Sequence, residues 1–343
     1  MDRIRFLQNK AAQIRIDLLK MIYEAKSGHT GGSLSCTDIL TVLYYSVMKI
    51  NPTNPSWEER DRFILSKGHS VESYYCILAD KGFFPKEDLK TFCKFGSKLI
   101  GHPNNDIPGI EMNTGSLGHG LPIAVGMALA AKMDGKSWRV FVLMGDGEQA
   151  EGSVWEGAMA ATHYNLDNLI AIIDRNKLQM SGNTEDVMGL EPLEEKWKSF
   201  GWEVRAVDGN DVKQLENALK SAPAVKNKPT IFMAYTIKGK GVSFTENDVG
   251  FPIPSTTKRI DITLEVVLNE LFVERAIVAE EILSYSPHIY KGIQKLLLNI
   301  PIDMIKHIEF KQKTQTTRAI IRTAEFTPYA NIILVAGAWG FKL

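Results

Sequence analysis

Two short polar clusters in this sequence carry the residue types of a metal site. Gly145-Asp146-Gly147-Glu148 follows one apolar run, and a second apolar run ends in Asp174-Arg175-Asn176-Lys177-Leu178-Gln179. Asp146 and Asn176 each offer a hard oxygen, the kind of ligand that Mg²⁺ prefers when it also holds a diphosphate. The glycines beside Asp146 let the backbone turn sharply and approach a phosphate. For each cluster taken alone, an ordinary turn is the stronger interpretation, because Asp and Gly are common turn residues.

The two clusters come together if the segments before them form parallel strands. Residues 140–144 and 169–173 are apolar runs of strand length, and a helix-like segment, residues 155–164, separates them. A buried strand, a helix and a second buried strand are typical of a βαβ unit, in which ligands collect at the carboxyl ends of the strands. Asp146 and Asn176 are 30 residues apart in the sequence, and we expect them to be neighbours in space.

Four of the seven histidines directly follow a glycine, in segments that we expect to be loops. These histidines are His29, His69, His102 and His119. Imidazole exchanges protons near neutral pH, so such residues suit acid–base chemistry and the binding of hydroxyl groups. Any one of them, taken alone, is equally well explained as a solvated loop residue.

The combination of Gly-Asp-Gly-Glu and the later Asp-x-Asn-x-x-Gln resembles the diphosphate and metal motif of thiamine-diphosphate enzymes, specifically transketolases. The resemblance implies that Asp146 and Asn176 bind Mg²⁺, with the backbone carbonyl of Leu178 as a third ligand. It also implies that Asn176 and Gly147 contact the diphosphate of the cofactor.

The histidines fit the same resemblance. His29, His69 and His102 match the active-site histidines of the family. The family uses such residues to contact the cofactor, to bind sugar hydroxyls and to shuttle protons, and His69 is implied in cofactor binding as well. His119 falls where many members carry Gln, and it matches a pattern of the shorter, split-chain members.

Two further segments match transketolases. Gly115, Ser116 and Leu117 match the loop that lies along the cofactor. Glu156 matches a carboxylate network that couples paired active sites across a dimer, and Glu151 is implied at the subunit contact. From the residues alone, both glutamates are explained equally well by a solvated helix face.

Composition excludes several classes of function. Lys plus Arg and Asp plus Glu each count 40 among 343 residues, so nothing biases the protein toward nucleic acid or an anionic membrane. No window approaches the roughly 20 apolar residues of a membrane helix, and residues 1–26 lack the core of a signal peptide. Three cysteines without a Cys-x-x-Cys pair are explained most simply by a reduced, cytoplasmic chain.

Periodicity predicts the elements around these motifs. Ser35 and Asp38 resemble a capping box that starts a helix extending to about Ile50. We expect helices at residues 4–26 and 211–221, a glycine-rich loop at 27–35, and strands at 63–65, 203–207 and 230–236.

After Asn247 the resemblance to transketolases ends. The family has a Trp-His-Gly-like motif here whose histidine binds the cofactor diphosphate, but this sequence reads Asp248-Val249-Gly250-Phe251. The pyrimidine-binding domain of the family is also missing from the sequence given. The resemblance therefore implies that another chain completes the site.

Residues 248–341 resemble a different family, the D-ribose pyranases, which interconvert ring forms of ribose. The matching segments are residues 252–261, 273–282, 307–311 and 327–334. Opening a hemiacetal requires an acid and a base near the ring oxygen. The resemblance assigns the sugar pocket to Asp248, His307, Tyr329 and Asn331, but the segment that carries the family's catalytic histidine does not adjoin Asp248. From the residues alone, 318–322 and 332–336 look like strands, and 329–331 is equally well a turn without chemistry.

We therefore expect an α/β protein in two parts. Residues 1–247 should form a parallel-sheet domain with helices on both faces that binds thiamine diphosphate and Mg²⁺, and residues 248–343 a smaller α/β segment. The first functional hypothesis is the N-terminal subunit of a transketolase, acting on sugar phosphates in a homo- or hetero-oligomer with a C-terminal, pyrimidine-domain chain. The second is a sugar-binding or ring-isomerase module in the tail. The third is a catalytically incompetent chimera.

Overall fold

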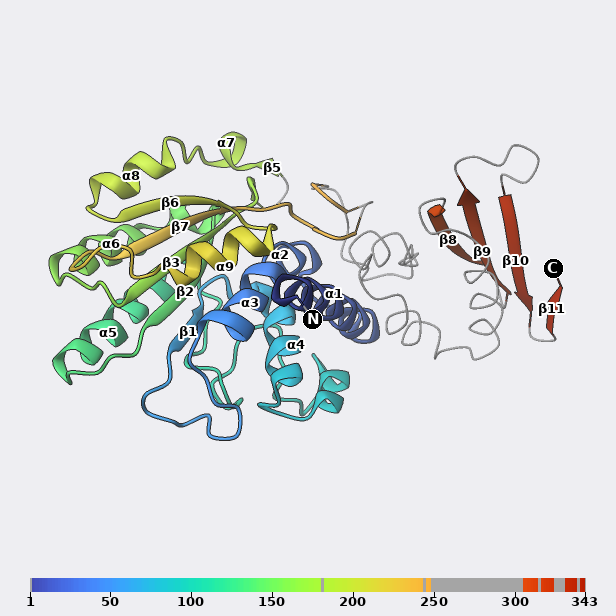
Figure 1. Ribbon diagram of the computed structural model, residues 1–343, viewed down its shortest axis with the longest axis horizontal. Coiled ribbons are helices and arrows are strands. Elements are labelled where there is room, and N and C mark those ends of the chain that lie inside the picture. The colour runs from blue at the N-terminus through green and yellow to red at the C-terminus, as the bar shows by residue number, and fades with distance from the viewer. Residues whose placement is uncertain are drawn as a thin grey trace. The chain divides into compact units, whose positions relative to one another are not determined.

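The computed structural model describes residues 2–179, 182–242 and 245–247, and four backbone segments nearer the C-terminus: 305–313, 316–323, 331–337 and 340–342. The chain divides into two compact units (Figure 1). The first comprises residues 1–240 and 244–256, and the second comprises 241–243 and 257–343. Each unit is described by itself below.

A five-stranded parallel sheet forms the centre of the first unit, with the strand order β1-β2-β3-β7-β6 (Figure 1). Helices between parallel strands cover both faces of such a sheet, and its inner strands are therefore nearly continuous apolar runs. This confirms the predicted strands and the α/β class. The bounds are β1 Arg62–Leu65, β2 Val140–Gly145, β3 Leu169–Arg175, β6 Glu203–Asp208 and β7 Thr230–Tyr235.

The helices of the first unit connect these strands. Before β2 they are α1 Arg3–Ala25, α2 Thr30–Ser35, α3 Thr37–Val42 with a π-helical turn Leu43–Val47, α4 Val71–Lys81 and α5 Gly120–Met133. After β2 they are α6 Gly152–His163, α7 Thr184–Val187, α8 Leu193–Ser199 and α9 Val212–Lys220. Turns of 3-10 helix span Gly68–Ser70, Lys86–Thr91 and Gly147–Ala150, and β4 Leu178–Gln179 pairs antiparallel with β5 Gly182–Asn183. No helix in the described ranges has both the length and the apolar character needed to cross a bilayer.

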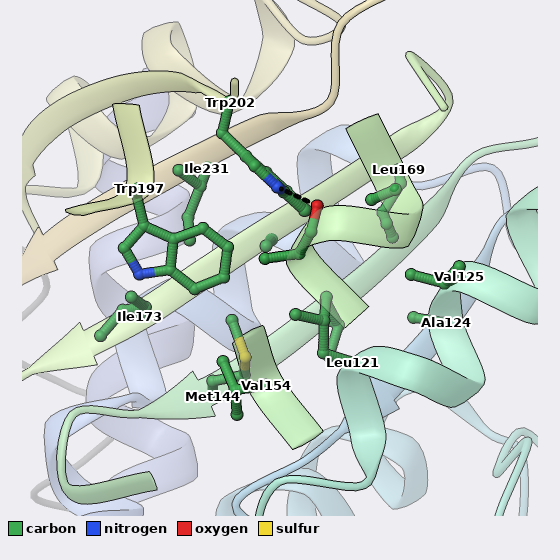
Figure 2. Close-up of a cluster of buried hydrophobic side chains, with 14 of the residues drawn as sticks. Leu121, Ala124, Val125, Met144, Val154, Leu169, Ile173, Trp197, Trp202 and Ile231 are labelled. Carbon is green, nitrogen blue, oxygen red and sulfur yellow. Dashed lines mark hydrogen bonds between the residues drawn. The ribbon is translucent and has the colours of Figure 1, made fainter. Parts of the chain in front are cut away.

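A cluster of buried hydrophobic side chains fills one face of the sheet (Figure 2). Every second residue of the central strands points into it, as the period of a strand requires. Helices α5, α6 and α8 cover these residues, and the indole N–H of Trp202 donates a 3.0 Å hydrogen bond to the carbonyl of Ala158 on α6. The strand residues are Val140, Val142, Met144, Leu169, Ala171, Ile173, Ile231 and Met233.

The other face of the sheet is covered by the N-terminal helices and α9. On β1, Phe63 packs with its ring centroid 5.7 Å from that of Tyr44 and 5.1 Å from that of Tyr74 on α4. Helix α9 lies against β6 and α3, with Asp211 as its N-cap. Both faces of the central strands are therefore covered, whereas the edge strand β6 is partly exposed.

The local predictions for residues 27–50 are partly wrong. The segment from Thr30 to Ser35 is a helix, and Ser35 is its last residue rather than the cap of the next helix. The Ser35 hydroxyl donates instead to the carboxylate of Asp174 on β3, at 2.6 Å. A tertiary hydrogen bond to a buried carboxylate has replaced the local cap. The predicted helix also ends at Val47 rather than near Ile50.

The described part of the second unit is an antiparallel sheet with the order β11-β10-β9-β8. Its strands are β8 Ile305–Lys313, β9 Thr316–Thr323, β10 Asn331–Gly337 and β11 Gly340–Lys342. The predicted strands at 318–322 and 332–336 are confirmed. Asp248, Tyr329 and residues 273–282, which from the sequence alone could be strand or helix, lie outside the described residues.

Candidate active site

The ends of β2 and β3 bring the two predicted metal ligands together. The strands run parallel with Gly145 opposite Asp174, so the residues that follow each strand meet at one edge. The Oδ2 atom of Asp146 accepts the backbone N–H of Lys177 at 2.6 Å, and its Oδ1 atom accepts that of Gly147 at 2.8 Å. Because Lys177 directly follows Asn176, the carboxylate and the amide belong to one small site.

Both side chains are buried. Asp146 is 3% exposed and Asn176 is 9% exposed, and the Oδ1 atom of Asn176 accepts the N–H of Leu178 at 3.1 Å. Burial and the nearby Asp174 carboxylate raise the pKa of Asp146. The Arg175 guanidinium lies 3.3 Å from Asp146 Oδ2 and offsets part of this effect. A divalent cation would favour the charged carboxylate in the same way.

The residues at these strand ends fit a metal-bound diphosphate. Their potential ligands are a carboxylate, an amide oxygen and a backbone carbonyl, all of which are hard oxygens. A Cβ atom on Gly147 would lie 2.8 Å from Cγ of Gln179, so a larger residue would displace that side chain. The buried Oε1 atom of Gln179 has no hydrogen-bond partner among the described residues. Lys238 adds a half-buried ammonium without an ion-pair partner in this part of the chain, and burial lowers its pKa.

A buried ion pair lies beside the metal ligands at the carboxyl ends of the strands. Lys67, just after β1, forms a short ion pair with Asp174 of β3, and both side chains are almost fully buried. Lys67 also donates to the carbonyl of Gly32 at 2.9 Å, and Asp174 accepts from Ser35 and Thr236. Burial opposes the charge of Lys67, but the Asp174 carboxylate outweighs it and raises the pKa of the ammonium. The pair therefore ties helix α2 to the ends of three strands.

A second buried carboxylate, Glu148, organises the loops around the metal site. It is 1% exposed and accepts the backbone N–H of Gly118 at 2.8 Å and that of Gly145 at 3.0 Å. The hydroxyl of Ser66 donates a third, short hydrogen bond. Burial raises the pKa of Glu148, and the three donors oppose that shift. One side chain thus joins the end of β1, the loop before α5 and the end of β2.

Three of the four Gly-His histidines form a cluster. The ring centroid of His29 lies 5.5 Å from that of His69 and 6.3 Å from that of His102. Burial, with the positive charge of Lys67, lowers the pKa of His69 to about 3. Burial and the neighbouring His29 lower the pKa of His102. His69 and His102 are therefore neutral near pH 7, when imidazole both donates and accepts hydrogen bonds.

The loop at Gly115 packs against this cluster. Gly115 has φ +137°, and a Cβ atom there would overlap the ring of His102. A Cβ on Gly68 would lie 2.7 Å from the backbone nitrogen of Gly115. The approach of the Gly115 backbone therefore requires glycine at position 68, and the ring of His102 and the positive φ require glycine at position 115. Leu117 follows in the same loop and is half-buried.

The remaining sequence candidates lie apart from the cluster. Ser116 and His119 are exposed, and their Oγ and Nδ1 atoms are 3.3 Å from each other. Glu151 and Glu156 are exposed at the start of α6 and in its second turn, and neither forms an ion pair in the described part of the chain.

Several organising residues were not singled out from the sequence. Lys67, Asp174 and Glu148 read there as polar residues of turns, although each is buried. A signal was present, because Asp174 continues an apolar run of strand length and Lys67 precedes a Gly-His pair at the end of a strand. Their partners come from distant segments, so the sequence did not identify them.

In the second unit, two of the predicted sugar-pocket residues are paired with the same residue of the strand between them. His307 on β8 and Asn331 on β10 are both paired with Arg322 on the strand between them. Residues directly opposite one another in neighbouring strands are closely spaced. His307 and Asn331 therefore occupy one row across three strands.

The first unit is an α/β enzyme domain whose carboxyl edge gathers oxygen ligands, a buried lysine and three histidines. Comparison with known proteins gives its family. The family described as "Transketolase, thiamine diphosphate binding domain" matches residues 7–252, and the chain belongs to it. The chain is thus a transketolase-like transferase subunit that depends on thiamine diphosphate. The RbsD / FucU transport protein family matches residues 229–339, so both predicted resemblances are confirmed.

Relatives of similar length are named as transketolase subunits. An apulose-4-phosphate transketolase subunit of Phocaeicola vulgatus is 48% identical over 244 residues, which is 71% of this chain and 87% of that protein. The 6-deoxy-6-sulfo-D-fructose transketolase subunit SqwG of Clostridium sp. (strain MSTE9) is 46% identical over 241 residues, 70% of this chain and 88% of that one.

Solved transketolases share the fold of the first unit. The enzyme of Campylobacter jejuni superposes with a TM-score of 0.68 at 35% sequence identity. The match covers 71% of this chain and 39% of that chain. This chain therefore spans less than half of the length of the solved enzyme.

Proposed function

We propose that this chain is the N-terminal subunit of a transketolase that transfers a two-carbon ketol unit between sugar phosphates. The observation that carries the proposal is the 2.6 Å hydrogen bond from the N–H of Lys177 to the Asp146 carboxylate, which joins the ends of β2 and β3. That contact gathers hard oxygens where a parallel sheet binds its ligand. The relatives named as transketolase subunits support the same assignment.

In this proposal, Asp146, Asn176 and the carbonyl of Leu178 hold Mg²⁺, and Gly147 and Asn176 lie against the diphosphate. The half-buried Lys238 adds a positive charge near Asp146. When bound, thiamine diphosphate supplies the nucleophilic carbon that carries the two-carbon unit. The protein then positions the sugar and moves the protons.

In this proposal the histidine cluster transfers protons to and from the sugar hydroxyls. His69, with the loop of Gly115, Ser116 and Leu117, lines the cofactor, and His29 and His102 bind the sugar hydroxyls. Neutral imidazoles suit this role because they accept a proton from one hydroxyl and return it to another. The low pKa values of His69 and His102 support it, since both remain neutral at physiological pH.

We further propose that the active site forms in an oligomer with a C-terminal, pyrimidine-domain chain. The outer surfaces of α5 and α6 support an interface, because Met133 is 78% exposed and Met159 is 54% exposed. Gly126 and Ala130 lie one turn apart on α5 and are exposed as well. Exposed apolar residues on two packed helices mark an association surface. Glu156, three residues before Met159, would then meet its carboxylate partners across that surface.

The proposal places the boundary between the two parts at residues 247 and 248, and the site of action in the cytoplasm. Cys36, Cys76 and Cys93 are free thiols, and two of them are buried. Such thiols suit a reducing compartment.

Calorimetry tests the proposed function. The full chain is titrated with thiamine diphosphate in the presence of Mg²⁺ or of EDTA, with and without a transketolase C-terminal chain. We expect weak binding to the chain alone, tight binding to the complex, and loss of both in EDTA. Equal affinity with and without the second chain would contradict the shared site. Transfer from ketose phosphates to aldose phosphates, followed by mass spectrometry, then identifies the substrates.

A sugar-ring isomerase in the second unit is the other candidate. The observation that favours it is the register of His307 and Asn331, both of which are opposite Arg322. Asp248 and Tyr329 complete the proposed pocket. NMR measurement of ribose anomer exchange with the full chain tests it, and an exchange rate equal to that in buffer would exclude it.

A further inference from the structure

A carboxylate that no motif singled out lies directly behind the histidine cluster. Glu72, near the start of α4, is fully buried. It accepts the backbone N–H of His29 and the hydroxyl of Ser33, each at 2.6 Å. No lysine or arginine pairs with it in the described ranges, and burial raises its pKa. The Nδ1 atom of His29 lies 4.0 Å from Glu72 Oε1.

The surrounding backbone is shaped to admit this carboxylate. Gly28 has φ +144°, and a Cβ atom there would lie 2.7 Å from Oε1 of Glu72. Only glycine is comfortable with that dihedral and that contact. The N–H of His29 donates to Glu72, and the carbonyl of His29 accepts the N–H of Ser33 at 3.2 Å, so both polar groups of the His29 backbone are hydrogen-bonded.

Packing alone gives little reason for an acid at this position. A buried carboxylate without a lysine or arginine is costly, and an apolar side chain of similar volume is often equally or more stable. The ring of His29 is partly exposed, while the acid behind it is not. The charge therefore acts on one accessible imidazole of the proposed sugar site.

The carboxylate also distinguishes the two nitrogens of His29. A negative charge beside Nδ1 favours the tautomer with the proton on that atom, which leaves Nε2 as an acceptor. The other groups near His29 are His69 and His102, and Lys67 with its ion-pair partner Asp174 lies farther back beside His69. Among the residues that the structure describes, Glu72 is the carboxylate within 4.0 Å of the His29 ring.

We propose that Glu72 is a positioning residue that holds His29 with its proton on Nδ1, so that Nε2 accepts the proton of a sugar hydroxyl. The role of Nε2 as the acceptor of a sugar proton rests on the proposed function. It predicts that the tautomer of His29 depends on Glu72 even in the absence of cofactor or substrate.

The test is NMR of the full chain labelled with ¹⁵N-histidine, because the ¹⁵N shifts report which ring nitrogen carries the proton. His29→Gln assigns the signals. In the wild type at pH 8 we expect the protonated nitrogen of His29 to be Nδ1, and in Glu72→Gln the proton should shift toward Nε2. The variant retains a side-chain oxygen for the N–H of His29 while removing the charge. Glu216→Gln, which changes a buried acid paired with Arg3 and Lys220, is the matched control and should leave His29 unchanged.

With the C-terminal chain present, Glu72→Gln should lower kcat on the order of tenfold and leave the affinity for thiamine diphosphate unchanged. An unchanged tautomer of His29 in Glu72→Gln would overturn the proposal. If no form of the complex transfers a ketol unit, the proposed function fails, and the NMR result still decides whether Glu72 orients His29.

Discussion

The two units place their candidate residues by different rules. In the first, β2 and β3 run parallel, so residues that follow them meet at one edge although Asp146 and Asn176 are 30 residues apart. In the second, neighbouring strands run antiparallel, so their carboxyl ends alternate and register brings residues together. His307 on β8 and Asn331 on β10 are there both paired with Arg322, on the strand between them. In the parallel sheet the candidate residues therefore follow the strand ends, whereas in the antiparallel sheet they are related by the pairing of neighbouring strands.

The strongest test of the first rule removes the residue at the end of β2. Asp146→Ala eliminates the carboxylate that we assign to Mg²⁺, and we expect the affinity for thiamine diphosphate with Mg²⁺ to fall about 100-fold or more. Calorimetry of the complex with the C-terminal chain measures it. Asp134→Ala, an exposed acid at the end of α5, is the control and should bind normally. If Asp146→Ala still bound thiamine diphosphate with the Mg²⁺ dependence of the wild type, the ends of β2 and β3 would not form the metal site.

The next effect concerns the loops that hold the strand ends together. Glu148→Ala leaves the N–H groups of Gly118 and Gly145 and the hydroxyl of Ser66 without their acceptor. Each unsatisfied buried donor costs on the order of 1–3 kcal/mol, so we expect a loss of about 3 kcal/mol or more in the free energy of unfolding. Urea unfolding of the full chain measures it.

Two variants calibrate that result. Glu148→Gln retains one acceptor and should fall between the wild type and Glu148→Ala. Glu59→Ala removes an exposed partner of Lys136, and surface pairs contribute roughly 0–1 kcal/mol. If Glu148→Ala lowered the free energy of unfolding no more than Glu59→Ala does, the three hydrogen bonds of Glu148 would not hold the loops together.

The first unit was more predictable where local sequence decides the structure than where distant segments meet. The apolar runs of β2 and β3 and the glycines around Asp146 specify strands that end in turns, and the parallel register then follows. The meeting of His29 with His69 and His102 depends on how α2 packs, which no spacing encodes. The Ser35 cap was wrong for the same reason, because its hydroxyl bonds to Asp174 on β3.

A pH-dependent effect separates the histidine cluster from ordinary surface histidines. An unfolded histidine has a pKa of about 6.5, whereas burial beside Lys67 lowers that of folded His69 to about 3. Between these values the unfolded state binds one proton more than the folded state, so stability is lost as pH falls through about 6.5. We expect His69 to account for a loss of about 2 kcal/mol between pH 7 and pH 5.

Urea unfolding of the wild type and of His69→Gln at both pH values measures this loss, which the variant should lack. His163→Gln, at the exposed end of α6, is the control and should retain the wild-type dependence. The same acid dependence in His69→Gln and in the wild type would mean that His69 is not held neutral by its surroundings.

The smallest effect on the cofactor site should come from the second unit. His307→Ala changes the row opposite Arg322 and should abolish any ribose anomer exchange that the wild type shows by NMR. Its affinity for thiamine diphosphate should stay within about twofold of the wild type, because His307 belongs to the second unit and none of the proposed cofactor ligands does. Lys313→Ala, at the far end of β8 opposite Thr316, should change neither measurement. Loss of cofactor affinity in His307→Ala would show that the two units depend on one another. Cofactor binding could then not be assigned to the first unit alone.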